Sequence, residues 1–73
     1  MNTIKLRVAK AIVNDVDSLI VMSLDPEGRK VCMTIAEFDE DGQAEFIINS
    51  NGIVSREEVG YKDSVAEFEK DWE

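Results

Sequence analysis

The sequence contains no histidine and only one cysteine, Cys32. Histidine is the commonest general base and the commonest metal ligand, so its absence removes most routes to acid–base catalysis and to transition-metal binding. A single cysteine forms no internal disulfide, and without histidine it supplies neither a zinc site nor a Cys–His nucleophile. We therefore expect no enzyme and no cofactor, and we expect Cys32 to be a small buried hydrophobe.

Long hydrophobic runs are also missing. The longest, Leu19 to Met22, has four residues, whereas a membrane span needs about 18. The N-terminus shows no basic-then-apolar signal with a small-residue cleavage site. A chain of 73 residues is expected to form one domain, 1–73, with a modest core. The sequence thus predicts a soluble cytoplasmic protein with no membrane contact.

Alternating apolar residues predict strands in the first two thirds of the chain. Ile4, Leu6 and Val8 alternate with charged residues, which is typical of a half-buried strand. The segment Leu19–Leu24 is apolar at both parities, as in a central strand that is covered on both faces. Further alternating segments lie at 30–38 and 43–48. Turn formers separate these segments at 14–18, Asp25–Gly28, Asp39–Gly42 and Asn49–Gly52.

The last third has helical features. Ser55–Glu58 and Ser64–Glu67 match the capping-box pattern, in which a serine and a glutamate three residues later cap the start of a helix. Val65, Phe68 and Trp72 form one helical stripe. We predict a helix from about Ser64 to Trp72, and the pattern leaves open whether residues 56–59 form a separate helical turn.

Together these elements predict an α+β fold, an antiparallel β-meander of four or five strands with a C-terminal α-helix. One short helix cannot cover both faces of the Leu19–Leu24 strand. We therefore expect a homodimer that covers either Ile20 and Met22 or Leu19 and Val21, with an exposed edge strand as a route to pairing.

The acidic run before Gly42 resembles part of a calcium loop. In an EF-hand, glycine occupies position 6 and a glutamate occupies position 12. With Gly42 at position 6, position 12 is Ile48, and with Gly52 at position 6, position 1 is Ile47. Each frame lacks a required ligand, so the run predicts a hairpin turn and no metal site.

The excess negative charge is confined to the second half of the sequence. Residues 1–36 hold five basic and four acidic residues, a net charge of +1, whereas residues 37–73 hold three basic and twelve acidic residues, a net charge of −9. Such asymmetry points to a partner of opposite charge. The alternative is a solvated acidic face that favours solubility.

The spacing of the acids suggests a comparison with nucleic acid. On the predicted helix, acids four residues apart stack roughly 6 Å apart along the axis, and on a strand acids two residues apart lie ~6.6 Å apart. Successive phosphates of a nucleic-acid strand have a similar separation, roughly 6–7 Å. The candidate partner-binding residues are Glu37, Asp39, Glu40, Asp41, Glu45, Asp63, Glu67 and Asp71.

In size, net charge, absence of histidine and the acidic run over 37–73, the chain resembles the small acidic bacteriophage proteins that mimic nucleic acid. That class includes inhibitors of restriction enzymes, of CRISPR nucleases, of uracil-DNA glycosylase and of the histone-like protein HU, and its members share no common fold. The resemblance implies action in a bacterial cytoplasm on a host protein with a basic groove. The basic residues Lys5, Arg7 and Lys10 depart from it and imply that only one face mimics.

The leading functional hypothesis is therefore a non-enzymatic inhibitor that occupies the basic DNA-binding site of a host nucleoid-associated protein or nuclease, without binding nucleic acid itself. The alternative is a protein-interaction subunit of a phage or bacterial assembly that binds through its apolar strand surface. A carboxylate enzyme or a metal protein is the least favoured hypothesis, because no motif supports either.

Overall fold

The computed structural model describes residues 5–47 and 51–70. Within these ranges the chain forms six strands, one 3₁₀-helix and one α-helix. In chain order they are β1 (Lys5–Val13), β2 (Val16–Leu24), β3 (Lys30–Glu37), β4 (Gln43–Ile47), β5 (Asn51–Ser55), η1 (Arg56–Glu58), β6 (Gly60–Lys62) and α1 (Val65–Lys70).

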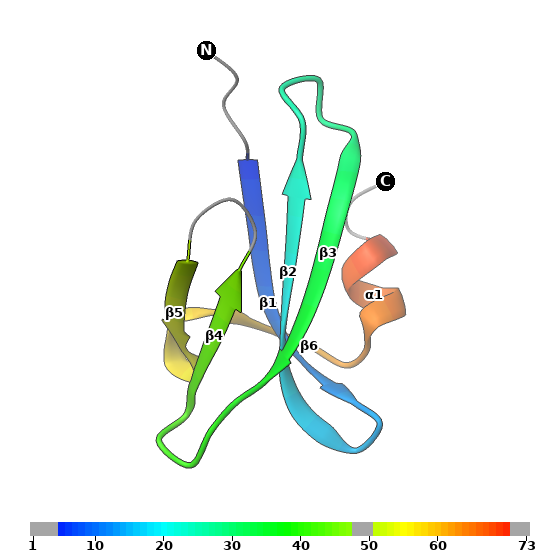
Figure 1. Ribbon diagram of the computed structural model, residues 1–73. Helices are drawn as coiled ribbons and strands as arrows, with labels where there is room; N and C mark the ends of the chain where they lie inside the picture. The colour runs from blue at the N-terminus through cyan, green and yellow to red at the C-terminus, as the bar shows by residue number, and fades with distance from the viewer. Residues whose placement is uncertain (1–4, 48–50, 71–73) are drawn as a thin grey trace.

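The strands form two sheets, shown in Figure 1. The larger sheet has the order β3-β2-β1-β6, and β4 and β5 form a separate two-stranded hairpin. Strands β1, β2 and β3 are antiparallel neighbours, but β6 runs parallel to β1, with Gly60 opposite Ala9. The predicted strand-rich fold with one C-terminal helix is confirmed at this level. The prediction of a purely antiparallel meander is wrong, because the parallel strand β6 makes the larger sheet mixed and because β4 and β5 form a separate sheet.

The connections β2–β3 and β3–β4 share one turn geometry. In each, a glycine N–H donates to the carbonyl of an aspartate three residues earlier, Gly28 to Asp25 and Gly42 to Asp39, both at 3.0 Å. The two glycines have φ values of 86° and 76°, which other residues rarely adopt. This is the type I turn followed by a left-handed residue that closes many hairpins. It confirms the turns predicted at these two Asp-x-x-Gly segments.

Strand β2 is the centre of the core. Ile20 and Met22 pack against Phe68 of α1 on one face of the sheet, whereas Leu19 and Val21 pack on the other face against a second cluster that the hairpin supplies. These four β2 residues are at most 1% exposed. The prediction of a strand covered on both faces is confirmed. The reason given for a homodimer is wrong, because the hairpin covers the second face within one chain.

The C-terminal region follows its predicted caps. The Ser55 and Glu58 side chains both complete the capping box of η1, so residues 56–58 form a 3₁₀ turn. At the start of α1, the Ser64 hydroxyl accepts a hydrogen bond from the Glu67 N–H at 3.2 Å. Phe68 is buried on the stripe that the sequence predicted, and Trp72 lies outside the described residues. No helix in the described part of the chain is long and apolar enough to cross a membrane.

Strand β3 lies at one edge of the larger sheet, and this position corrects the prediction for Cys32. Cys32 is exposed rather than buried. Its neighbour across the sheet is Ser23 of β2, and none of the described strands lies on its other side, because β3 ends the sheet order. The alternation of the sequence predicted that the Cys32 side chain points to one face of the sheet, but it did not show that this side chain is exposed at the edge strand.

Candidate functional site: an acidic end

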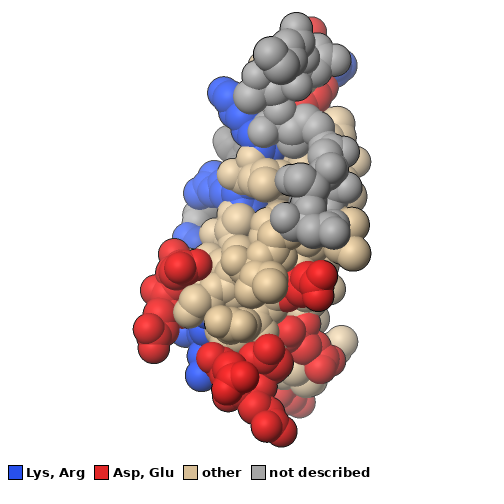
Figure 2. Space-filling view, turned by 60° about the vertical axis from the view of Figure 1, so that its left-hand side comes forward, with Lys and Arg blue, Asp and Glu red and all other residues tan. Residues whose placement is uncertain are grey.

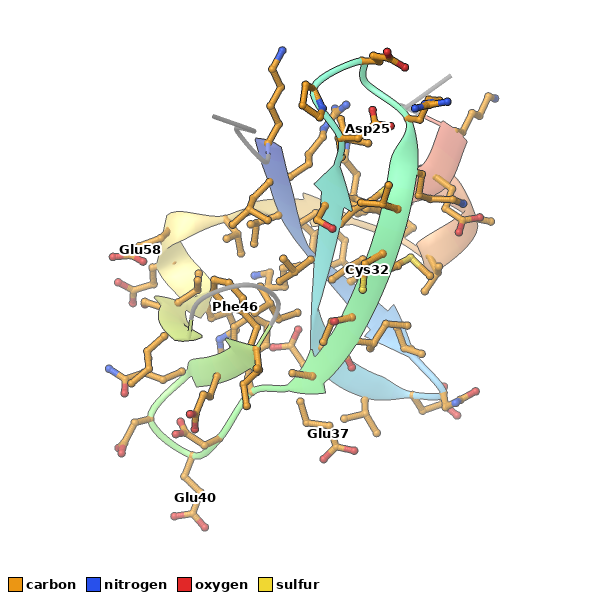
Figure 3. All side chains as sticks on the ribbon, turned by 45° about the horizontal axis from the view of Figure 1, so that its top comes forward. Asp25, Cys32, Glu37, Glu40, Phe46 and Glu58 are labelled. Carbon is orange, nitrogen blue, oxygen red and sulfur yellow. The ribbon has the colours of Figure 1, made fainter. Side chains whose placement is uncertain are left out.

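Acidic side chains gather where the β3–β4 turn, β4 and η1 meet. Figure 2 shows them along the lower end of the molecule, with basic side chains mainly above the middle. In Figure 3, Glu40 points outward from the tip of the turn and Glu58 points outward beside the hairpin. All of these acids are exposed. We call this group the acidic end, and it consists of Asp39, Glu40, Asp41, Glu45, Glu57 and Glu58.

Asp39 shapes the turn rather than projecting from it. Its carboxylate oxygen Oδ1 accepts hydrogen bonds from the N–H groups of Asp41 and Gln43, both at 2.9 Å. Its own N–H donates to the carbonyl of Gln43 at 2.8 Å. These bonds fix the backbone, as Asx turns do. Glu40 and Asp41 are therefore held at a defined tip, although their side chains face solvent.

The 3₁₀-helix η1 adds two acids that the sequence analysis did not select. The Arg56 N–H donates to the carbonyl of Gly42 at 2.6 Å, so Glu57 and Glu58 lie next to the acidic turn. The Glu58 carboxylate also accepts from the Ser55 N–H at 3.2 Å. The capping-box pattern left this helical turn open, and the contact between Arg56 and Gly42 joins segments whose proximity has no local signal.

The Arg56 guanidinium lies within the acidic end, but it already forms an ion pair with an acid outside this group. Its Nη1 donates to Asp17 Oδ2 at 2.9 Å. This pair connects the start of β2 to the end of the hairpin. Glu40, Asp41, Glu45 and Glu57 form no ion pair with any other residue in the described ranges. Their charges are therefore available to a partner.

Acids at the opposite end of the sheet have cationic partners. Arg29 pairs with Asp25 at 2.7 Å and with Glu27 at 2.9 Å, and Lys30 pairs with Glu69 of α1 at 3.5 Å. The Arg29 N–H and the Arg29 guanidinium hold the pKa of Asp25 below its ordinary value. By contrast, Glu40, Asp41, Glu45 and Glu57 of the acidic end have no such partner in the described ranges.

The structure does not bring all predicted site residues together. Glu37 ends β3 opposite Ser18, which places it on the face that α1 covers, at the margin of the acidic end. Asp63 precedes α1, and Glu67 folds back so that its carboxylate accepts from the Asp63 N–H at 3.1 Å. Asp71 lies outside the described residues. Because α1 and the hairpin cover opposite faces of the sheet, the helix acids are separate from the acidic end.

The arrangement of these acids bears on metal binding. In the described ranges, no group of three or more histidine, cysteine or acidic residues could hold a metal ion. At the turn itself, Asp39 Oδ1 already accepts two backbone N–H groups. What the acidic end offers is a set of carboxylate acceptors for a cationic partner.

No protein-family model, no curated protein and no solved structure matches the chain. The function is therefore inferred from the charge and the geometry of the acidic end.

Proposed function

We propose that this protein is a non-enzymatic inhibitor whose acidic end occupies the basic DNA-binding groove of a bacterial nucleoid-associated protein or nuclease. The observation that carries the proposal is the set of exposed carboxylates at one end, Glu40, Asp41, Glu45 and Glu57, that have no cationic partner in the described chain. We place the protein in the bacterial cytoplasm, as the resemblance to phage-encoded mimics of nucleic acid implies.

The chemistry of a DNA-binding groove fits these groups. Such grooves present lysine and arginine side chains to phosphate oxygens, and carboxylate oxygens accept the same charge-assisted hydrogen bonds. Binding at the acidic end breaks no internal ion pair of Glu40 or Asp41. The hydrogen bonds of Asp39 also fix the turn before binding, which reduces the entropy lost on association.

The position of the basic residues supports a one-sided mimic. Lys5 begins β1, at the end of that strand away from the β1–β2 turn, and Lys10 lies over the Tyr61 ring at 5.3 Å. A basic groove attracts the acidic end and repels the basic strand, so the long-range field orients the encounter. In this proposal Glu37 contributes at the margin, and Asp63 and Glu67 do not contribute.

The alternative function, a subunit of a phage or bacterial assembly, needs a different surface from the one predicted. Residues Leu19 to Ser23 of the predicted apolar strand are at most 1% exposed, so the folded chain cannot offer them to a partner. The outer face of the hairpin is a possible substitute, because Ile47 is 66% exposed and Ile53 is 68% exposed. Binding through these side chains would resist salt, whereas binding through the acidic end would not.

A salt-dependent pull-down from bacterial lysate tests the proposal. The wild-type protein should recover DNA-binding proteins at low salt and release them as salt rises. The charge-reversal variant E40K/D41K should lose this partner while its thermal unfolding stays close to wild type, because exposed substitutions usually change stability by under about 0.5 kcal/mol.

The matched control is D63K/E67K, which changes the net charge equally but lies off the acidic end. It should retain the partner once its folding has been verified by circular dichroism. If both variants lose the partner equally, overall charge rather than the acidic end carries binding. If neither variant changes the affinity or its salt dependence, the acids of the turn are only a solvated face.

A further inference from the structure

Strand β3 has a free edge. It ends the order of the larger sheet, and no described strand pairs with its outer side (Figure 1). None of its eight residues is fully buried. The outer edge of such a strand presents unpaired N–H and C=O groups, which form a template for another strand.

Beyond the irregularity at Val31, this edge lacks the usual protection against pairing. Natural edge strands are kept apart by charged side chains, by proline or by being short. The opposite edge, β6, has three residues and includes Lys62. Between Val31 and Ala36, by contrast, β3 has neither a charge nor a proline, and Val31 and Ile35 are 58% and 43% exposed. An unprotected apolar edge of this length favours association.

The charges at the two ends of β3 are self-complementary. The strand begins at Lys30 and ends at Glu37. The register with β2 has an irregularity between Ser23 and Leu24 that leaves Val31 unpaired. As a result, four residues of β3 lie on one face of the sheet, opposite alternate residues of β2: Lys30 opposite Leu24, Met33 opposite Met22, Ile35 opposite Ile20 and Glu37 opposite Ser18. A second copy that runs antiparallel would therefore bring its glutamate to this lysine, whose Nζ also lies 3.5 Å from Glu69 Oε1 of its own chain.

We propose that β3 pairs with β3 of a second copy, antiparallel, about a two-fold axis at Thr34. In this register Met33 lies opposite Ile35 of the partner subunit. With Val31 as a bulge, Lys30 lies opposite Glu37 of the partner subunit, and the arrangement repeats on the other side of the axis. The two four-stranded sheets become one continuous sheet. The two proposals share only Glu37, at the margin of the acidic end, so either proposal can fail without the other.

Sedimentation equilibrium tests the interface by charge reversal. The wild-type protein should have twice the monomer mass of 8.2 kDa. Each of K30E and E37K should weaken dimerisation about tenfold, because each creates two like-charged cross-strand pairs per dimer, and K30E/E37K should restore it. A wild-type monomer at every soluble concentration overturns the proposal. So does a dimer that the single reversals leave unchanged.

Disulfide trapping tests the register independently. In a Cys32→Ser background, Thr34→Cys should form a covalent dimer under mild oxidation, because residues on the two-fold axis have Cα atoms about 4.5–5.5 Å apart, within disulfide range. The wild-type Cys32 serves as the matched control. It lies opposite Ala36 of the partner subunit and should not cross-link. Equal cross-linking of both proteins, or of neither, overturns the proposed register.

Discussion

The contact between Gly52 and Phe46 gives the sharpest test of the hairpin. The two residues face each other in the β4–β5 register, and a Cβ built on Gly52 would lie 2.5 Å from Phe46 Cζ and 2.7 Å from Cε1. Carbon atoms normally approach to about 3.5–4.0 Å, so Gly52→Ala must displace the ring by about 1 Å. Phe46 is 9% exposed and packs in the cluster with Leu19 and Val21, so the ring has little room to move.

Overpacking of this kind costs about 1–3 kcal/mol. For a domain of this size, each kcal/mol lowers the melting temperature by about 4–8 °C. The assay is urea unfolding followed by circular dichroism, with Gly60→Ala as the matched control. Gly60 also lies in a strand, but a Cβ there meets no atom within 4 Å. That control should be neutral or should stabilise by up to about 1 kcal/mol. Equal free energies of unfolding for Gly52→Ala and the wild type would refute the close packing of Phe46 on Gly52.

Two further predictions concern a turn and the core. The pKa of Asp25 is below its ordinary value of 3.8 chiefly because the Arg29 N–H donates to its carboxylate, so the stabilisation by this carboxylate is present above pH 3.8 and is lost as the pH falls below that value. Asp25→Asn should therefore unfold more easily than wild type at neutral pH. Unfolding of both proteins followed as the pH is lowered should show this difference in stability disappearing, whereas a constant difference would contradict the proposed cause. Phe68 is 1% exposed and packs against Ala9, Ala11 and Ile20. Phe68→Ala should therefore lower the free energy of unfolding in urea by about 3–5 kcal/mol. The control Ala66→Ser, on the exposed side of α1, should change it by less than about 0.5 kcal/mol.

The sequence predicted the features that depend on local patterns. Apolar residues at both parities of Leu19–Leu24 identified the central strand, and Asp-x-x-Gly identified two turns with a left-handed glycine. The serine–glutamate pair at Ser64 predicted the start of α1, whereas the pair at Ser55 left open whether residues 56–59 form a helical turn. In each case the residues that carry the signal lie within about six positions of one another, so no tertiary contact was needed to interpret it.

Features that depend on distant contacts were not predicted. Strand β6 has three residues, too few for a periodicity, and its partner β1 lies at the other end of the chain. The pattern of β2 showed that both faces are covered, but it did not show that the hairpin covers one of them. For that reason the sequence pointed to a second copy. The contact of Arg56 with Gly42, which adds Glu57 and Glu58 to the acidic end, likewise has no local signal.

The parallel pairing of β6 with β1 has a consequence for the order of folding. Strands β1, β2 and β3 are joined by short turns, so their pairing closes only small loops, whereas Gly60 meets Ala9 only after a much longer loop has closed. We therefore expect the three-stranded ribbon to form first and β6 with α1 to dock late. During synthesis, Ile20 and Met22 stay uncovered until the segment with Phe68 has left the ribosome. A nascent chain thus presents an apolar face that α1 covers in the folded protein.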